Sequence, residues 1–400
     1  METIMAPSAG LREVLASFGS NYRLEHKLPE QQLKAMYAIQ HCRTPAMGGR
    51  VDSCDHCGHK RIVYNSCRNR HCPQCQGMKQ AKWVDKLNTT LLPVSYFHLV
   101  FTIPSELNRL ALVNQKCLYD ILFKAASESL LLLSRDKKYL NVQSGLLAVL
   151  HTWGQNLMDH PHLHTIVPSG GWCQTAQCWR PSSKKFFIPV KVISAVFKGK
   201  FLALLKQAHR QNQLKFDGQI KPLHLKGNFK ALLNLVYAKE WVVYAKKPFK
   251  NSAHIVNYLS RYTHRVAISN DRITGIEGDQ VIFNWKDYRE LGRIKSMKLP
   301  AAEFIRRFLL HVLPKGFCKI RYYGILAFRN RNEILLKCKK VLAYSSSKSK
   351  LAGLSWQDTL LVITGMDILK CPVCKKGNMV TTELLIGNRA PPESVAIFVP

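Results

Sequence analysis

The feature that most constrains how this chain can fold is a run of paired cysteines, CDHCGHKRIVYNSCRNRHCPQC, at residues 54–75. Cys54 and Cys57 form one C-x2-C pair, and Cys72 and Cys75 form another. Two thiolates three residues apart can bind one ion from a tight turn, and a second pair completes a tetrahedral zinc site. We therefore expect a small zinc-binding unit in which these four cysteines bind one structural Zn²⁺.

Other potential metal ligands lie in and beside this run of cysteines. Cys67, His59 and His71 fall inside it, and His41 and Cys42 lie just upstream. A second ion, or the exchange of a cysteine for a histidine ligand, is compatible with this sequence. The exact ligand set is therefore open at this point.

Basic residues are abundant in this region and in the whole chain. Arg61, Arg68 and Arg70 lie between the paired cysteines, where they either contact DNA or balance the charge of the thiolates. The chain has 59 Lys and Arg against 25 Asp and Glu, a formal net charge of +34. Such an excess indicates a polyanionic partner, with nucleic acid expected ahead of an anionic membrane surface.

The apolar segments are short. None approaches the roughly 20 residues needed to span a membrane, so no membrane partner is expected. The first residues lack the basic and apolar regions of a signal peptide. We therefore expect a cytoplasmic, nucleoid-associated protein, in which the 13 cysteines bind metal or stay as buried thiols.

The middle of the chain alternates between strand and helix patterns. Strands rich in β-branched and aromatic residues are predicted at 94–104, 145–153, 161–168 and 240–247. Amphipathic helices are predicted at 105–133, 190–210 and 227–239. This order predicts an α+β domain built on a sheet.

The third predicted strand belongs to the sequence DHPHLHTIVPSGG at residues 159–171. Side chains alternate along a strand, so His162 and His164 share one face and could bind a single divalent cation. Histidines also line ordinary sheet faces, and this short motif taken alone favours that interpretation over a metal site. His160 would join that face only if the strand began before Pro161, which is disfavoured.

A pair of tyrosines follows further along the chain. Tyr258 and Tyr262 lie four residues apart in NYLSRYTHRVAISN, so they share one face of a predicted helix. Taken alone, this spacing favours an ordinary packed tyrosine pair over a functional site. The neighbouring Arg261, His264 and Arg265 suit a surface that faces phosphate.

Together these features resemble the HUH endonuclease superfamily and, more closely, the two-tyrosine rolling-circle transposases of the insertion-sequence "ninety-one" family. The similarity covers residues 30–330 and is carried by YNSCRNRHCPQCQ (64–76), HTWGQNLMDHPHLHTIVPSGG (151–171), YLSRYTHRVAISN (258–270) and EFIRRFLLHVLPKGFCKIRYYGILA (303–327). It implies an α+β fold, with an HUH-type antiparallel sheet and flanking helices preceded by a small zinc-binding domain.

The resemblance also implies roles for individual residues. His162 and His164 would be metal ligands, and Tyr258 and Tyr262 would be nucleophiles. The cysteine run would be the N-terminal zinc-binding domain. The third ligand of the catalytic metal stays open among the nearby Gln155, Asn156, Asp159 and His160.

The implied reaction nicks and rejoins DNA at the ends of a mobile element. A tyrosine oxygen attacks a backbone phosphate, releases a 3′-hydroxyl and stays joined to the 5′-phosphate. Mg²⁺ or Mn²⁺ at the histidines would polarise this phosphate, whereas Zn²⁺ would occupy the thiolate site.

The chain has no G-x4-G-K-[ST] motif of a P-loop ATPase. The implied partners are therefore single-stranded or locally melted DNA and a host helicase, with Arg261 and Arg265 among the DNA contacts.

The expected division of the chain has five parts. They are an N-terminal helical lead (1–30), a zinc-binding DNA-recognition domain (31–90), the HUH catalytic domain (91–295), a helix and strand part of the catalytic region (296–345), and a linker and tail (346–400).

The C-terminal third contains one strongly patterned helix and one isolated cysteine pair. Residues 303–314 predict an amphipathic helix with a core-facing stripe of Phe304, Ile305, Phe308, Leu309 and Val312, flanked by Arg306 and Arg307. CPVC at 371–374 is half a zinc knuckle, which either binds metal with Cys318 or Cys338 or binds nothing. Residues 376–400 are expected to be loosely ordered.

Three other functions fit parts of this sequence. A plasmid replication initiator or a relaxase uses the same chemistry, but relaxase tyrosines usually precede the histidine pair, whereas here they follow it. A non-enzymatic zinc-dependent DNA-binding protein would not need the two histidines, His162 and His164, or the two tyrosines, Tyr258 and Tyr262. A metal-dependent nuclease would use water and form no covalent protein–DNA adduct.

Overall fold

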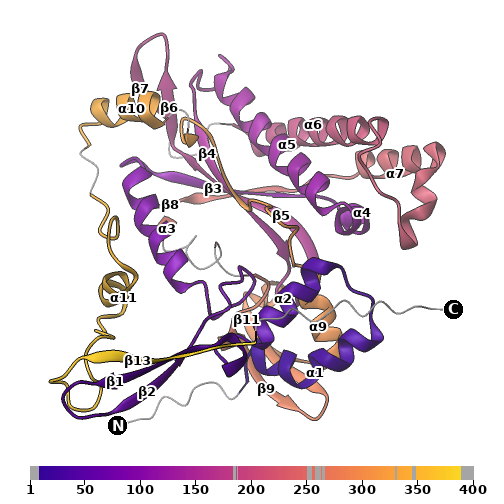
Figure 1. Ribbon diagram of the computed structural model, residues 1–400. Coiled ribbons are helices and arrows are strands. Elements are labelled where there is room, and N and C mark those ends of the chain that lie inside the picture. Colours follow the sequence, from indigo (N-terminus) through magenta and orange to yellow (C-terminus); the bar gives the residue numbers. More distant parts are fainter. Residues whose placement is uncertain are drawn as a thin grey trace.

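The computed structural model describes residues 9–182, 186, 188–249, 255–256, 263, 266–328, 331–344 and 348–388. These residues form an α+β structure with four antiparallel sheets (Figure 1). The largest sheet lies at the centre, and two three-stranded sheets lie at the end of the molecule where the N-terminal helices pack. Among the described residues, no helix is long and apolar enough to cross a membrane.

The central sheet has five strands in the order β12-β4-β5-β3-β8, and every neighbouring pair is antiparallel. Their bounds are β3 Tyr96–Thr102, β4 Gly145–Trp153, β5 Asp159–Pro168, β8 Val243–Phe249 and β12 Ile320–Gly324. The four strands predicted from the sequence are therefore confirmed, whereas β12 was not predicted. The small β6 (Gly170–Cys173) and β7 (Cys178–Pro181) form a separate hairpin.

Helices α4 (Asn108–Val113), α5 (Gln115–Arg135), α6 (Val190–Arg210) and α7 (Lys226–Ala238) cover one face of the central sheet. Apolar side chains that alternate along the strands, such as Phe97, Leu99 and Phe101, share a core with these helices. The helix predicted over 105–133 is broken at Asn114. Its side-chain amide nitrogen donates to the carbonyl of Lys215 (2.9 Å), and its amide oxygen accepts from the Lys215 N–H (2.7 Å).

The opposite face of the central sheet is covered differently. Helix α3 (Gly77–Thr90) packs there, together with Ile255 and Val256. Their sheet partners include Leu147, Val149 and Ile166, which alternate with the residues of the other core. This face also carries the histidines described below.

The N-terminal helices α1 (Leu11–Glu25) and α2 (Glu30–Gln40) lie against a sheet of β9 (Ile273–Glu277), β10 (Gln280–Asp287) and β11 (Arg293–Pro300) and against α9 (Ala301–Leu309). Residues 1–30 were expected as a separate lead, but α1 shares one core with these distant elements. The helix expected over 303–314 ends at Leu309, and its whole predicted apolar stripe is buried.

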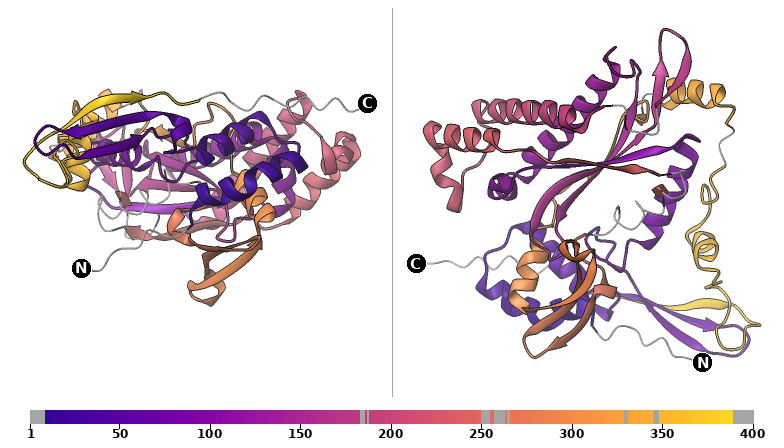
Figure 2. Two further views of the ribbon diagram at one scale, coloured as in Figure 1. Left: turned by 60° about the horizontal axis from the view of Figure 1, so that its bottom comes forward. Right: turned by 180° about the vertical axis from the view of Figure 1, so that it is seen from behind.

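A third sheet projects from the molecule beside the N-terminal helices. It consists of β1 (Gly49–Cys54), β2 (Lys60–Tyr64) and β13 (Met379–Leu385) in the order β13-β1-β2. The chain reaches β13 through α10 (Leu336–Val341) and α11 (Trp356–Thr364), which run along the side of the molecule (Figure 2). The prediction of a loosely ordered tail over 376–400 is wrong for β13, because β1 offers it a free strand edge. Residues 389–400 lie outside the described part.

Short helical turns complete the described structure. They are the 3₁₀ segments Pro45–Met47, Ser105–Leu107, Gly218–His224, Asn270–Arg272 and Tyr288–Glu290, and the π-helical Arg331–Leu335.

Candidate active site and cysteine clusters

Three histidines meet on two central strands. His162 and His164 lie on the same face of β5, as the alternation of a strand requires. His151 lies on β4 directly opposite His162 in the antiparallel ladder. One ligand nitrogen from each ring lies within 4.8 Å of the others. The predicted pair therefore becomes a group of three, which the sheet itself holds together.

The spacing of the three rings suits a divalent cation. The Nε2 atoms of His162 and His164 are 3.1 Å apart. Two ligand nitrogens about 2.1 Å from an ion and at a right angle to one another are separated by ~3 Å. The ring centroids of His151 and His164 are 4.3 Å apart. The spacing of these imidazoles therefore fits a divalent metal ion.

Hydrogen bonds orient the two imidazoles of β5. Nδ1 of His162 lies 2.6 Å from the carbonyl oxygen of His160, so Nδ1–H donates and Nε2 keeps its lone pair. Nδ1 of His164 lies 2.8 Å from Nε2 of His98, which is on the neighbouring β3. In both rings Nε2 faces the shared position. Such outer partners fix ring orientation in metal sites.

The histidines are suited to bind metal at neutral pH. Burial lowers the pKa of His162 to about 4. Burial, together with the neighbouring His162 and Lys319, lowers the pKa of His151 well below its usual range. Both rings are therefore neutral at pH 7 and have a lone pair for a cation. Burial also lowers the pKa of Lys319 to about 7.

The structure groups His151, which was not among the four candidates from the sequence, with His162 and His164. Asp159 and His160 do not belong to the group of three. Strand β5 does begin before Pro161, but its pairing with β4 is irregular between His151 and Trp153, so His160 is exposed.

The other candidates for the third ligand differ in their contacts. Among the described residues, the carboxylate of Asp159 has no hydrogen-bond partner, and burial raises its pKa to about 7. The amide oxygen of Asn156 accepts from the Met158 N–H (3.2 Å), and its carbonyl accepts from Arg307 (3.0 Å). The loop that holds Gln155 and Asn156 is thus tied to α9. Arg306 and Arg307 also both donate to Glu303 (2.6 Å each).

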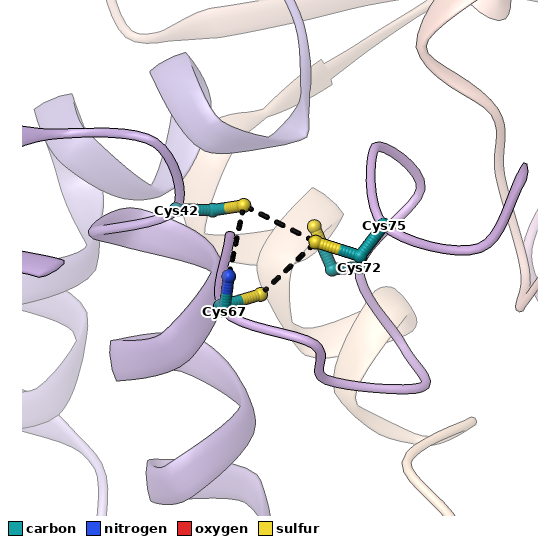
Figure 3. Close-up of side chains that lie close together, drawn as sticks. All are labelled: Cys42, Cys67, Cys72 and Cys75. Carbon is teal, nitrogen blue, oxygen red and sulfur yellow. Dashed lines mark hydrogen bonds between the residues drawn. The ribbon is translucent and has the colours of Figure 1, made fainter. Parts of the chain in front are cut away.

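The first cysteine cluster consists of Cys42, Cys67, Cys72 and Cys75 (Figure 3). Cys42 follows α2, and the other three lie in the loop between β2 and α3. The sulfur of Cys75 lies 3.3 Å from that of Cys42 and 3.6 Å from that of Cys67. No disulfide joins them, and hydrogen bonds from the other three thiols lower the pKa of Cys75. Four converging sulfurs of this kind fit a tetrahedral zinc ion.

The predicted ligand set Cys54, Cys57, Cys72 and Cys75 is therefore wrong as a set. Cys54 and Cys57 lie in a second cluster with Cys371 and Cys374. The reason is the β1–β2 hairpin, which carries the first pair to its tip while the second pair lies beyond its base. At about 3.3 Å per residue, the five residues of β2 separate tip and base by ~16 Å. Of the additional candidates, Cys67 joins the first cluster.

The histidines of the cysteine region are not in either cluster. Nε2 of His71 accepts a hydrogen bond from the Leu313 N–H (3.1 Å), and burial lowers the pKa of His71 to about 3. His59 contributes its backbone carbonyl, which accepts from the Cys54 N–H (2.9 Å). His41 is the C-terminal cap of α2. Cys318 and Cys338 likewise belong to neither cluster.

Arg70 acts inside the protein. Its guanidinium donates to the carbonyl oxygens of Leu313 (3.1 Å), Pro314 (2.6 Å) and Phe317 (2.6 Å). It thereby ties the first cysteine cluster to the segment between α9 and β12. This contact was not expected from a residue predicted to bind DNA.

The other two arginines of the cysteine region differ from one another. Arg61 donates to the Asp52 carboxylate (3.1 Å) and to the carbonyl of Ile368 (3.2 Å). Arg68 is exposed, with a positive φ of 52°. Among Arg61, Arg68 and Arg70, only Arg68 is exposed, whereas the other two are half-buried.

Tyr258, Tyr262, Arg261 and Arg265 lie outside the described residues. The described residues before them are Ile255 and Val256, which pack on the face of the sheet that carries the three histidines. Thr263, which follows Tyr262, is buried.

Sequence reasoning missed His151, His98 and the partners of the cysteine pairs. His151 lies in a strand that was predicted correctly, and pairing that strand with the next in an antiparallel hairpin would have placed it near His162. Cys371 and Cys374 had a recognisable C-x2-C spacing, but their separation from Cys54 along the chain hid the connection.

Comparisons with known proteins find matches to two protein families. A family described as "Putative transposase" matches residues 145–334, and one described as "Transposase zinc-binding domain" matches residues 14–103. The "Putative transposase y4qJ" of Sinorhizobium fredii is 43% identical over 383 residues, which cover 95% of this chain and 96% of the relative.

A second relative is more distant. The "Transposase for insertion sequence element IS801" of Pseudomonas savastanoi pv. phaseolicola is 25% identical over 394 residues, which cover 96% of this chain and 92% of the relative. No solved structure matches this chain.

Proposed function

This chain belongs to the insertion-sequence "ninety-one" family of transposases with an N-terminal zinc-binding domain, and we propose that it nicks and rejoins single-stranded DNA through a covalent 5′-phosphotyrosine. The observation that carries this proposal is the group of His151, His162 and His164 on the central antiparallel sheet. A partly buried imidazole group of this kind, in which His151 and His162 are neutral at pH 7, suits a cation that binds phosphate.

The nucleophiles in this proposal are Tyr258 and Tyr262. Support comes from the residues that precede them, because Ile255 and Val256 pack on the histidine face of the sheet beside Val149 and Ile166. In the reaction, a phenol loses its proton and its oxygen forms a bond to phosphorus. The bond from phosphorus to the 3′-oxygen breaks, and that oxygen leaves as a hydroxyl. The phosphodiester energy is conserved, so rejoining needs no ATP.

The histidine residues would hold a divalent cation, Mg²⁺ or Mn²⁺, whose charge would stabilise the phosphate in the transition state. His98 and the carbonyl of His160 would keep the Nε2 atoms of His164 and His162 directed at this cation. A tyrosine with an ordinary pKa of about 10 needs such positive charge to react as phenolate at neutral pH.

The zinc-binding domain and the net charge support DNA as the partner. The first cysteine cluster would hold Zn²⁺ as a structural ion. Arg68, which is exposed beside this cluster, would contact the DNA backbone. We further propose that the DNA is single-stranded or locally melted at element ends, with strand separation supplied by a host helicase.

The test uses the purified chain with Mn²⁺ and labelled single strands that carry the ends of the element. We expect a protein–DNA adduct that survives heat and SDS. It should be lost in Tyr258→Phe/Tyr262→Phe and in His162→Ala/His164→Ala, and it should be retained in the matched control His224→Ala, whose histidine is exposed and remote from the group of three.

Two outcomes would overturn the proposal. Metal-dependent cutting without an adduct would indicate a nuclease that uses water. Sequence-specific binding of the ends without cutting would indicate a zinc-dependent DNA-binding protein without catalytic activity.

A further inference from the structure

The second cysteine cluster joins two parts of the chain that are far apart in sequence. Cys54 and Cys57 lie at the tip of the β1–β2 hairpin, and Cys371 and Cys374 lie between α11 and β13. Their four sulfurs lie within 4.8 Å of one another. The residues matched by the zinc-binding family end at 103, so two of these four cysteines lie outside that family's limits.

The distances between the sulfurs fit a metal ion better than a disulfide. The sulfur of Cys54 is 3.7 Å from that of Cys374, and the sulfur of Cys57 is 3.7 Å from that of Cys371. A tetrahedral ion with Zn–S bonds of about 2.3 Å places its sulfurs ~3.8 Å apart. A disulfide would require about 2.05 Å, and all four cysteines are free thiols.

Both cysteine pairs have the same turn geometry. The Gly58 N–H donates to the Cys54 carbonyl (3.1 Å), and the Lys375 N–H donates to the Cys371 carbonyl (3.1 Å). The residue after each pair has a positive φ, 70° at Gly58 and 59° at Lys375. The two halves are thus matching knuckles, although they come from opposite ends of the chain.

Backbone amides also point at the sulfurs. The His56 N–H lies 3.4 Å from the sulfur of Cys54, and the Gly377 N–H lies 3.4 Å from the sulfur of Cys374. N–H groups that face sulfur stabilise thiolates, which are the form that binds metal. This arrangement is not needed by a thiol buried only for packing.

Gly377 shows how closely the two halves approach. A Cβ atom at this position would lie 2.5 Å from the sulfur of Cys54 and 2.6 Å from Cβ of His56. Both contacts are closer than atoms in proteins allow, so only glycine permits the approach. The C-terminal half is therefore shaped to fit the N-terminal hairpin.

We propose that Cys54, Cys57, Cys371 and Cys374 bind a second structural Zn²⁺, which fastens the C-terminal segment to the N-terminal zinc-binding domain. Four thiols would release their protons as the ion binds. The ion would anchor β13 beside β1, where the Thr381 hydroxyl also donates to the Asp52 carboxylate (2.9 Å). The three-stranded sheet would then be completed only after almost the whole chain has been synthesised. This inference does not depend on the proposed DNA chemistry.

The test is the metal content of the full-length protein, purified without chelator and then loaded with Co²⁺. Cobalt bound to thiolates has an intense charge-transfer absorption that cobalt bound to histidine lacks. We expect Cys371→Ser/Cys374→Ser to lose half of this absorption and one zinc ion per chain. The matched control Cys178→Ser/Cys318→Ser, whose cysteines belong to neither cluster, should lose neither. An undiminished absorption in Cys371→Ser/Cys374→Ser would overturn the proposal.

The histidine site is distinguished within the same experiment. His162→Ala/His164→Ala should keep the full thiolate absorption, whatever its effect on DNA cleavage. A change in DNA cleavage with both thiolate centres intact would bear only on the proposed catalytic function. Loss of one thiolate centre with cleavage intact would bear only on the second zinc site.

A measurement on the unchanged protein covers the case in which the double serine variant does not fold. Alkylation followed by mass spectrometry should find Cys371 and Cys374 protected together with Cys54 and Cys57, and all four should become reactive on addition of a chelator. Alkylation of Cys371 and Cys374 while Cys54 and Cys57 stay protected would overturn the proposal. Protection that responds to reductant but not to chelator would also overturn it, because it would indicate disulfides.

A glycine variant then tests the fit of the two halves without removing a ligand. Gly377→Ala should weaken retention of the second ion at least tenfold in a chelator competition. Gly275→Ala, at a glycine with nothing within 4 Å of its added Cβ, should have no effect. Equal retention in the two variants would contradict the geometry described here.

Discussion

The histidine group and the first cysteine cluster both gather metal ligands, but the backbone holds them in different ways. His151, His162 and His164 lie on paired strands, so the β4–β5 ladder fixes them whether or not an ion is bound. Cys67, Cys72 and Cys75 lie in a loop, and Cys42 follows a helix. We therefore expect metal removal to stop the chemistry at the histidine group without unfolding it. The same treatment should unfold the first cysteine cluster.

The largest effect is expected at the histidines. His162→Ala/His164→Ala should lower the rate of adduct formation by roughly 10³-fold or more, because the charge that stabilises the transition state is lost. The far-UV circular dichroism spectrum should not change, since the ladder does not depend on these side chains. A variant that loses its fold together with its activity would contradict the contrast between the two sites.

Substitution in the first cysteine cluster should, in contrast, destabilise the fold. Cys72 is buried and packs in the core shared with α1 and α9, so Cys72→Ser should cost on the order of 4 kcal/mol of unfolding free energy through loss of the ion. Limited proteolysis should then cut within residues 65–76. Cys117→Ser, outside both clusters, is the control and should leave this region resistant.

A buried histidine beside the active site predicts a pH dependence of stability. His311 is 0% exposed, and burial lowers its pKa from 6.5 to about 4. Because the folded-state pKa lies below the unfolded one, the stabilisation is complete above pH 6.5 and is lost as the pH falls through about 4. The contribution is at most about 3 kcal/mol.

Urea unfolding of the wild type and of His311→Gln at pH 7.5, 5.5 and 4.5 measures this contribution. The wild type should lose more unfolding free energy than the variant between the first and last pH. Equal losses would mean that His311 does not titrate between these limits. Other buried histidines affect both proteins alike and cancel in the comparison.

The smallest effects are expected for substitutions of two neighbouring arginines, Arg68 and Arg70, whose roles differ. Arg70→Ala should lower the unfolding free energy by about 2 kcal/mol, because three carbonyl oxygens lose a charged donor. Arg68→Ala should leave stability unchanged but reduce the salt dependence of DNA binding by about one phosphate contact. Measurement of both properties in both variants checks this, and an exchange of the two phenotypes would contradict the assigned roles.

The strands and helices of the central domain were largely predictable because each has a strong local pattern. The strand over 145–153, the helix over 190–210 and the face shared by His162 and His164 follow from residue periodicity alone. The break at Asn114 was not predictable, since it depends on a side-chain contact with Lys215, about a hundred residues away.

The ligand sets were harder to predict, because ligands meet through tertiary contacts. Cys54 and Cys72 appeared to share an ion from their spacing, but the length of the β1–β2 hairpin separates them. Cys371 could be recognised as half a knuckle, whereas its partner Cys54 lies more than three hundred residues away. His151 needed the pairing of two strands, which is information that neither strand contains alone.

The most direct test of the central claim is mass spectrometry of the protein–DNA adduct. After reaction with single strands carrying the element ends, nuclease and protease digestion should yield a nucleotide-linked peptide. We predict that the link is a 5′-phosphate on Tyr258 or Tyr262, formed only with a divalent cation and an intact His162 and His164. A link to any other residue, or cleaved DNA with no linked peptide, would contradict phosphotyrosine transfer.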